Sequence, residues 1–415
     1  MVRKCYGSSL PENSSMVKTL YNRLSSPRRD VAFWMTVGST SAAFLMMFQI
    51  YMVAPIIDDM AKDLGADGRL MGLIIPSITI PLGLSALMSG KLTFWIGERK
   101  LALYTAFSLA LGALLISFSP NGFCVIACRI ITGLALGALL PLSFRFTSQN
   151  YPIAGRFFPI MIIVFGMAAG MTFGPVLGGV LYPLMGWRVE FLIVSLLSAV
   201  FFVFVFNFSS RIKDKARAEG KIRSWKKTDL GETCRGGNLC ILMFILLNGI
   251  FHSGLFVWTS TVLTVRYALG EIPLGFLLLD FGLPGLVLVV ILGIFSKGPS
   301  RLKMEFLGLA ILGFCITLIM LKVTPWLTFL AIALLSVGYN ITQPLFFGIV
   351  GRMGNSHKAQ IAVQLGCCFL FVGYGLGPVI FGFLMGLGSL SSILFLLFLV
   401  ACLATISRAV FQDRD

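Results

Sequence analysis

The run Gly166-Met-Ala-Ala-Gly-Met-Thr-Phe-Gly-Pro-Val-Leu-Gly-Gly179 lies inside an apolar segment, 157–185, that is long enough to cross a bilayer as a helix. Its glycines at positions 166, 170, 174 and 178 recur every four residues, so they line one face of that helix. A face without side chains lets a neighbouring helix approach to backbone distance. Pro175 removes one backbone donor and bends the helix. The run therefore predicts a bent, close-packed membrane helix.

The composition extends this prediction to the whole chain of 415 residues. Hydrophobic residues make up 57% of it and charged residues 12%, about half of what a soluble domain carries. The apolar residues come in runs of about 20, which is too long for ordinary core helices. We therefore expect an all-α polytopic membrane protein. Twelve spans are predicted: 31–57, 70–90, 101–119, 123–144, 157–185, 191–208, 239–263, 274–295, 306–323, 326–350, 361–386 and 390–411.

The net charge of +16 reflects topology and does not indicate a nucleic-acid partner. Of the 33 Lys and Arg residues, 27 fall in the two ends of the chain and in alternate loops, five fall in the intervening loops, and Arg129 lies inside a span. This asymmetry is the positive-inside rule, so both termini are expected in the cytoplasm, with the basic loops near anionic lipids.

The same pattern divides the chain into parts. Residues 1–30 are predicted to be a cytoplasmic tail, because no signal-peptide pattern is present, and either Met1 or Met16 could be the start. Residues 211–238 form a cytoplasmic linker with nine basic and four acidic residues. The linker separates a six-helix bundle over 31–210 from a second one over 239–411, and 412–415 form a short cytoplasmic tail.

The two bundles resemble copies of each other. At one fixed offset of 203 residues, eight Gly and Pro positions coincide, three of them Pro with Pro. The matched pairs are Gly72 and Gly275, Pro81 and Pro284, Gly90 and Gly293, Pro141 and Pro344, Gly170 and Gly373, Gly174 and Gly377, Pro175 and Pro378, and Gly179 and Gly382. The chain is therefore expected to be a pseudo-symmetric pair of parallel repeats, an organisation found in transporters.

Three motifs show a resemblance to the major facilitator superfamily, most closely to its twelve-helix drug:proton antiporter branch, over about 31–411. The first is the glycine run described above, which matches the fifth-helix signature of exporters in that family. The second is Arg129-Ile-Ile-Thr-Gly133-Leu-Ala-Leu-Gly137 in the fourth span. The third is the loop after the second span, which keeps Gly90, Gly97 and Arg99.

The loop motif departs from the family pattern in its charges. Phe94 and Trp95 stand where the family has Asp-Arg, and Glu98 replaces an Arg. In the family that Asp belongs to a cytoplasmic charge relay that steadies the outward-open state. The sequence therefore leaves open how this chain closes its cytoplasmic side.

The resemblance implies alternating access, with the Gly–Pro faces of the fifth and eleventh spans as close-packed hinges between the halves. The expected hinge residues are Gly170, Gly174, Pro175, Gly178, Gly179, Gly373, Gly377 and Pro378.

Proton coupling needs a group that responds to protons, and few candidates exist. An arginine inside a membrane is costly unless it faces water or a partner, and such residues usually serve a function, so Arg129 is one candidate. The alternative is that Arg129 lies near the outer surface and its side chain extends to the headgroups. Asp280 is the only carboxylate well inside a predicted span, and His252 titrates near neutral pH. Either residue could instead be a packed or hydrogen-bonded interface residue. The first span offers only Gln49, which cannot titrate.

A substrate-binding set follows from the spans that line the cavity in the family. Polar residues of the first, seventh and tenth spans are the candidates, since amides in hydrocarbon should face a cavity or another helix. They are Gln49, Asn248, His252, Tyr339, Asn340 and Gln343.

These features favour a proton-coupled exporter of a small organic compound, acting as a monomer in a bacterial inner membrane. The alternative is a proton symporter that imports a small metabolite, for which an anion would suit Arg129. A membrane receptor or scaffold would need a large soluble domain, which the sequence lacks. No phosphate-binding loop, metal-ligand spacing or catalytic constellation is present, so we expect no ATP drive, cofactor or metal, and no enzyme activity. Small molecules, protons and membrane lipids are the expected partners.

Overall fold

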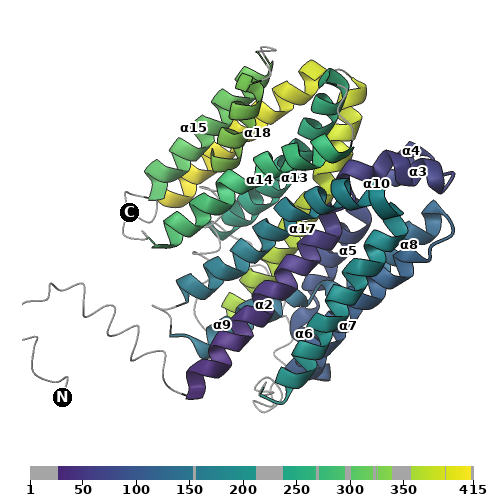
Figure 1. Ribbon diagram of the computed structural model, residues 1–415. Coiled ribbons are helices and arrows are strands. Elements are labelled where there is room, and N and C mark those ends of the chain that lie inside the picture. The colour runs from purple at the N-terminus through teal and green to yellow at the C-terminus, as the bar shows by residue number, and fades with distance from the viewer. Residues whose placement is uncertain are drawn as a thin grey trace, which may run out of the picture.

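A computed structural model describes residues 27–152, 156–211, 237–267, 271–294, 301–320, 324, 326–338, 357–387 and 389–412. Within these ranges the chain is helical and forms no strand (Figure 1). The predicted tails, nearly all of the linker 211–238, and the candidates Tyr339, Asn340 and Gln343 lie outside the described residues.

The first half of the chain forms helices that are often interrupted by proline or glycine. The first predicted span continues past Tyr51 through a short 3-10 turn that contains Pro55. The helices and their bounds are α2 (Pro27–Tyr51), η1 (Ala54–Ile56), α3 (Ile57–Asp63), α4 (Gly68–Met71), α5 (Pro76–Ala86), α6 (Ser89–Ile96), α7 (Glu98–Ser117), α8 (Gly122–Leu136), α9 (Leu139–Asn150) and α10 (Phe157–Ser209).

α10 contains two spans. Its 53 residues would extend about 80 Å as one straight helix, more than twice the hydrocarbon thickness of about 30 Å. Gly186, with φ 77° and ψ 159°, breaks the helix where only glycine is easily accommodated. The indole Nε1 of Trp187 donates to Asp63 Oδ2 at 2.8 Å, and Arg188 forms an ion pair with the same carboxylate. These bonds fix the break against the end of α3.

The second half contributes α13 (Gly237–Tyr267), α14 (Glu271–Ile294), α15 (Arg301–Met320), a helix over residues 326–338, α17 (His357–Gly386) and α18 (Ser389–Gln412). In the described part of the chain, seven helices are long and apolar enough to cross a membrane, and the one over Phe158–Ser209 holds two predicted spans. Shorter apolar helices match the other four predictions: Leu278–Val287, Leu307–Ile316, Trp326–Gly338 and Phe395–Ile406.

The helices pair in the same way in both halves. α2 packs along the first part of α10, and α13 packs along α17 in the corresponding manner. α7 packs on α10 and α15 on α18. Between the halves, α5 packs on α17 and α10 on α14. Gly83 lies against the carbonyl of Cys368, and Gly275 against Pro175, so both of these contacts bring backbones close together.

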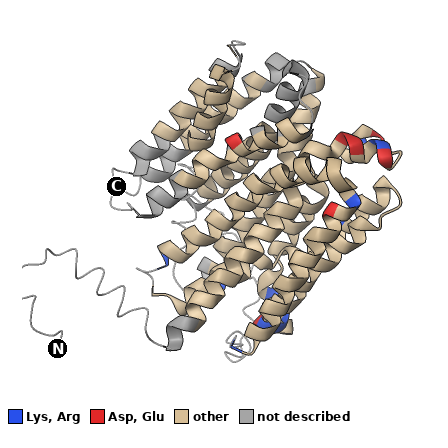
Figure 2. Cartoon of the chain, in the orientation of Figure 1, with Lys and Arg blue, Asp and Glu red and all other residues tan. Residues whose placement is uncertain are grey.

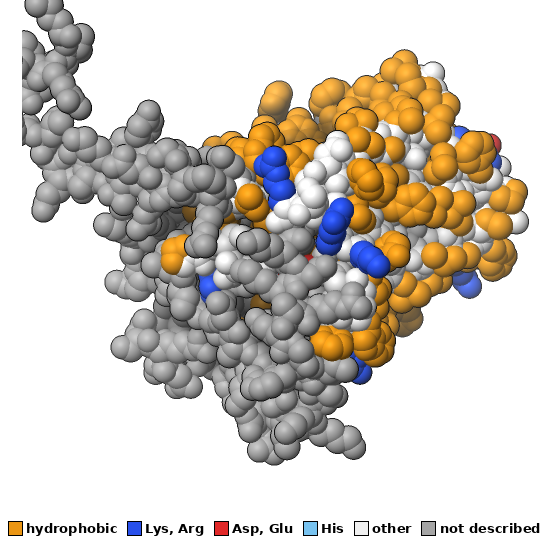
Figure 3. Space-filling view, turned by 90° about the horizontal axis from the view of Figure 1, so that it is seen from below, with side chains coloured by type: hydrophobic (Ala, Val, Ile, Leu, Met, Phe, Trp, Pro, Cys, Tyr) orange, Lys and Arg blue, Asp and Glu red, His pale blue; other side chains and the backbone are white. Residues whose placement is uncertain are grey.

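The two ends of the helix bundle carry different charges (Figure 2). α3 and α4 are the acidic end, with Asp58, Asp59, Asp63 and Asp67. We call the opposite end, where α7 begins and α9 ends, the basic end; it carries Lys91, Arg99, Lys100, Arg145, Arg156 and Arg211. Figure 3 looks onto the basic end, where Lys and Arg side chains lie among apolar ones. This is the end that the sequence predicts to be cytoplasmic.

The glycine run packs on α2 of its own half. A Cβ added at Gly166 would lie 2.6 Å from the carbonyl oxygen of Thr40, and one at Gly174 would lie 2.9 Å from that of Phe48. Gly170 and Gly178 meet the carbonyls of Phe44 and Met52 in the same register. The predicted approach at backbone distance is therefore present.

The second half repeats this packing between α17 and α13. The contact of α10 with the second half is made by other residues than its row of glycines. Gly373 and Gly377 meet the carbonyls of Leu246 and Ile250 on α13. Across the halves, an added Cβ at Gly275 would lie 3.0 Å from the oxygen of Pro175 and 3.5 Å from the Cα of Gly179. The glycine faces thus join helices within a half, while Pro175 and Gly179 face the other half. Their hinge role stays a prediction.

Candidate functional site

Arg129 is the largest fully buried side chain in the described residues. Its exposed fraction is 0%, so it does not reach the headgroups as the snorkelling alternative requires. None of its three guanidinium nitrogens has a hydrogen-bond partner within the described part of the chain. The guanidinium carbon lies 5.5 Å from the ring centroid of Phe191, a cation–π contact.

α8 is held in place on both sides of Arg129. At its start, Asn121 accepts a hydrogen bond from the backbone N–H of Cys124 at 2.9 Å and caps the helix. Further along, Gly133 lies against the backbone of Ile78 on α5, and Gly137 lies against Ser85 and Ala86. The glycines of the arginine motif therefore dock α8 on α5, which fixes the position of Arg129.

Glu190 is a buried carboxylate that the sequence analysis missed. It is 1% exposed, and neither carboxylate oxygen has a hydrogen-bond partner among the described residues. It precedes Phe191, the ring under Arg129, and a Cβ added at Gly178 would lie 3.0 Å from its Oε1. The predicted span started one residue later, at 191, and this placed Glu190 in a loop. Because Gly186 ends the turn, the helix instead resumes at Trp187 and buries Glu190.

α2 carries two buried polar side chains, Gln49 and Tyr51. Gln49 is 0% exposed, and both atoms of its amide group are unpartnered in the described structure. Tyr51 is also fully buried, with its ring edge-on to Phe256 of α13 at 5.3 Å. Ser253 lies next to Tyr51, yet neither hydroxyl forms a hydrogen bond of good geometry with the residues that the structure describes. Tyr51 therefore touches the other half of the protein.

The predicted residues of α13 face α17. Asn248 and His252 are 4% and 6% exposed, as expected for two residues one turn apart on an inner helix face. The His252 ring lies 5.8 Å from the ring of Tyr374. Tyr374 is a further buried polar residue that the sequence analysis passed over, although it lies inside the Gly373–Pro378 motif.

Asp280 lies on a different helix from these residues. It is half-buried on α14, about 140° around the helix from Gly275, which faces α10. The structure thus buries Gln49, Asn248, His252 and Arg129 and leaves Asp280 half-buried.

The loop motif ties the two halves together at the basic end. Gly97 has φ 89° and ψ 153°, which favours glycine, and it starts α7. Glu98, fully buried, accepts from Arg145 Nε at 2.8 Å and from Gln149 at 3.0 Å. Arg145 also donates to Gln360 of α17 at 3.1 Å, across the halves.

The other two residues of the loop motif support the same region. A Cβ at Gly90 would lie 2.5 Å from Gln364 Nε2 of α17, so Gly90 permits a close approach of the other half. Arg99 donates to Ser209 at 3.2 Å and holds the start of α7 on the end of α10. The family's acidic residue is replaced by Phe94, but a connection between the halves is present through Glu98, Arg145 and Gln360.

Comparison with known proteins places this architecture. The sequence profile of the Major Facilitator Superfamily matches residues 40–369, about four fifths of the chain. The chain belongs to the major facilitator superfamily. Members of this family are membrane transporters that carry small molecules.

Individual relatives differ in what they are named for. The transporter YdgK of Bacillus subtilis, whose function is uncharacterised, is 27% identical over 259 residues, which cover 60% of this chain and 61% of YdgK. The multidrug export protein EmrB of Escherichia coli K12 is 27% identical over 145 residues, or 35% of this chain and 28% of EmrB. The gallate transporter of Pseudomonas putida is 26% identical over 141 residues, or 34% of this chain and 31% of that protein. The matched part of this chain thus spans between about a quarter and three fifths of these relatives.

A solved structure extends the fold assignment to nearly the whole chain. The human organic anion transporter MFSD10 superposes with a TM-score of 0.68 at 16% identity, covering 94% of this chain and 99% of MFSD10. This similarity supports the twelve-helix fold. Among the residues that the structure describes, no group of three His, Cys, Asp or Glu side chains gathers as metal ligands would.

Proposed function

We propose that this transporter exports a small organic compound in exchange for protons, by alternating access of its two halves. The observation that carries the proposal is Arg129. An arginine within a membrane helix costs about 3 kcal/mol or more unless it meets a partner or water. Here the side chain is fully buried with no hydrogen-bond partner in the described structure. A functional role would explain why so costly a residue is present. An arginine without a fixed partner can respond when a nearby group gains or loses a proton.

Protons would be carried by a titratable side chain that is buried or half-buried within the helix bundle. Glu190, next to the Phe191 ring that Arg129 covers, joins His252 and Asp280 as a candidate carrier. When Glu190 is ionised, Arg129 attracts it; when it is protonated, Arg129 is free to attract the substrate or another residue. Gln49, Asn248 and His252 would bind the substrate from α2 and α13. Tyr339, Asn340 and Gln343, outside the described residues, stay candidates from the tenth span.

The proposal also covers the orientation and the oligomeric state of the protein. The basic end would face the cytoplasm of a bacterial cell, in its inner membrane, with both termini on that side. The protein would work as a monomer.

Arg129→Ala tests the proposal. In proteoliposomes with an imposed proton gradient, we expect the variant to lose proton-driven transport, measured as substrate flux with and without an uncoupler. Arg69→Ala removes an exposed arginine at the acidic end and should keep wild-type flux. Full transport by the Arg129 variant would contradict the proposal. The substrate for the assay would come from a growth and accumulation screen of expressing cells against toxic compounds.

Import by proton symport is the second candidate. The similarity to a protein named as a gallate transporter favours it, because gallate is an aromatic acid and Arg129 could attract an anion. A pH jump distinguishes the two functions: an inward proton gradient drives uptake in a symporter and efflux in an antiporter.

A further inference from the structure

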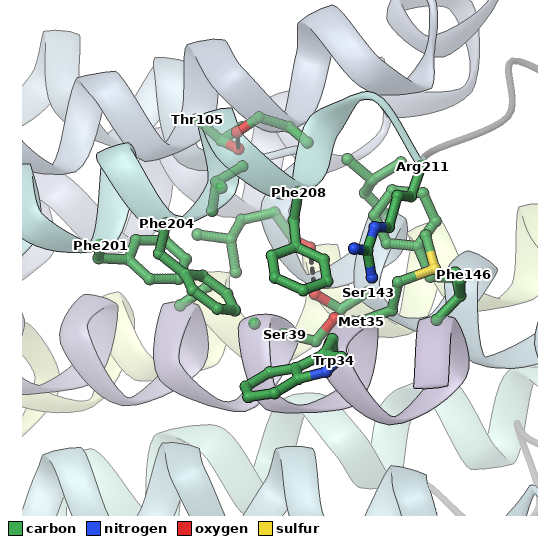
Figure 4. A pocket seen from close by; sticks show the side chains of 17 residues that line it. Trp34, Met35, Ser39, Thr105, Ser143, Phe146, Phe201, Phe204, Phe208 and Arg211 are labelled. Carbon is green, nitrogen blue, oxygen red and sulfur yellow. Dashed lines mark hydrogen bonds between the residues drawn. The ribbon is translucent and has the colours of Figure 1, made fainter. Parts of the chain in front are cut away.

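A cavity at the basic end lies away from the candidate site. It is enclosed by α2, α7, α9 and the second part of α10, all in the first half of the chain. The space amounts to about 620 Å³ when its open mouth is included. None of the predicted substrate or proton residues lines it. Figure 4 shows Phe201 at one end of this basic-end cavity and Arg211 at the other.

The walls of the basic-end cavity suit an apolar occupant. Trp34, Phe204 and Phe208 form a continuous aromatic wall, with ring centroids 5.2–6.1 Å apart. The hydroxyls of Ser143 and Thr105 donate to carbonyls of their own helices, at 2.9 and 3.0 Å. A polar solute would therefore find few donors left inside, whereas an aliphatic chain would lose contact with water at no cost in hydrogen bonds.

The mouth of the cavity carries positive charge. The Arg211 guanidinium is exposed and lies 4.7 Å from the ring centroid of Phe208. Arg99 is bonded to Ser209, only two residues away. Phe33 and Trp34, 54% and 39% exposed, lie on the same end of α2. Exposed aromatic rings of this kind mark the membrane interface, so the charged mouth lies at headgroup level.

The depth of the cavity matches one leaflet of a bilayer. Arg211 lies ten positions after Phe201 and two past the end of α10, which corresponds to about 15 Å along a helix. The hydrocarbon core of a bilayer is about 30 Å thick, so one leaflet spans half of that. An acyl chain whose headgroup lies at Arg211 would thus reach the aromatic end at Phe201.

We propose that the basic-end cavity binds an anionic phospholipid of the adjacent leaflet, with the phosphate on Arg211 and one acyl chain among Trp34, Phe204 and Phe208. The site is separate from the transport site, and its occupancy does not depend on the direction of transport.

The test counts lipids bound to the full-length protein after delipidation in detergent. Dioleoylphosphatidylglycerol or dioleoylphosphatidylcholine is added, and bound lipids are measured by native mass spectrometry. One basic contact near a membrane surface corresponds to about a fivefold preference for the anionic lipid. We expect the wild type to show this preference and Arg211→Gln to lose it. Lys100→Gln, which removes an exposed lysine outside the cavity, should keep it.

A second variant tests the cavity itself. Ala42→Phe places a ring in the cavity while leaving Arg211 in place, so it should reduce retention of both lipids. Its thermal unfolding shows whether it is folded; if it is not, Arg211→Gln alone decides. An equal preference in the wild type and Arg211→Gln would overturn the proposal. So would a wild type that retains oleate but neither phospholipid, which would make the cavity a site for fatty acids.

Discussion

Arg129 and Glu190 are two residues of opposite charge that are both buried, and neither side chain forms a hydrogen bond with the described part of the chain. Ionisable side chains buried within membrane helices usually serve a function. Phe191 lies under the guanidinium and directly follows Glu190 in the sequence. Uptake of one proton by Glu190 would change the summed charge of the two residues from zero to +1, and its loss would reverse this.

Glu190→Gln tests that role. The amide keeps the shape of the side chain but cannot carry a proton, so we expect the variant to lose proton-driven flux and to retain exchange of labelled for unlabelled substrate. Both rates are measured in proteoliposomes. Asp58→Asn, an exposed acid on α3, is the matched control and should keep both. Loss of substrate exchange together with loss of proton-driven flux would show that Glu190 is needed for binding or folding. That result would count against a role in carrying protons.

The sequence predicts some of these residues and misses others for a local reason. Arg129 was identifiable because it interrupts an apolar run, and Asn248 and His252 because they share a helix face. Glu190 was missed because the position of a helix start after a glycine is uncertain by a residue or two, and burial depends on it. Ser253 and Tyr374 carry small or amphipathic side chains that apolar spans commonly contain, so composition does not distinguish them.

At the scale of elements, α7 depends on how it begins. Gly97 holds φ 89° and ψ 153°, and the next residue, Glu98, is buried against Arg145. A side chain at Gly97 would be strained, and the strain would move Glu98 from its partner. Arg145 in turn reaches Gln360 on α17, so the start of one helix also affects the contact between halves.

Gly97→Ala should lower the free energy of unfolding by about 1–3 kcal/mol, the cost of a backbone conformation that only glycine adopts easily. The measurement is thermal or denaturant unfolding in detergent. Gly386→Ala is the control, because that glycine ends α17, has no neighbouring atom within 4 Å of an added Cβ and needs no positive φ. A Gly97 variant as stable as the control would contradict the strain argument.

Gln360→Ala removes the contact between halves and leaves the Glu98–Arg145 pair intact. A hydrogen bond to a charged group is worth about 1.5 kcal/mol, so the basic end should open roughly tenfold more often. Hydrogen–deuterium exchange of α6 and the start of α17 should quicken accordingly. Asn150→Ala removes an amide that bonds only to Phe146 of its own helix and to Met35, both in the same half, and should leave exchange there unchanged. Unchanged exchange in the Gln360 variant would mean that other contacts close this end.

At the scale of the whole molecule, the most extensive helix contacts between the halves in the described part of the chain are α5 with α17 and α10 with α14. The offset of 203 residues predicted the symmetry that makes these pairs equivalent. It could not predict which face of a helix meets which neighbour, because a row of glycines shows only that something comes close. The glycine run was expected to form a hinge between the halves. The face that carries Gly166, Gly170, Gly174 and Gly178 packs on α2 of the same half.

A disulfide between the halves tests alternating access directly. In a background without the nine native cysteines, Gly179→Cys combined with Gly275→Cys should form a cross-link, because an added Cβ at Gly275 lies 3.5 Å from the Cα of Gly179. Transport should stop on oxidation and return on reduction. Each single variant should transport under both conditions. Transport that continues through the oxidised double variant would mean that α10 and α14 do not move apart at this point.

The contact between α10 and α2 restricts substitution on one helix more than on the other. At Gly166, Gly170, Gly174 and Gly178 the nearest atom to an added Cβ is a backbone carbonyl oxygen of α2 or of Met52, the residue that follows it, at positions four apart. The hydrogen that occupies the Cβ position therefore points at an oxygen, in the geometry of a weak Cα–H···O bond. Every residue type carries that oxygen, but only glycine carries that hydrogen. Natural variation at this interface should therefore accumulate on α2, while the four positions of α10 tolerate almost none.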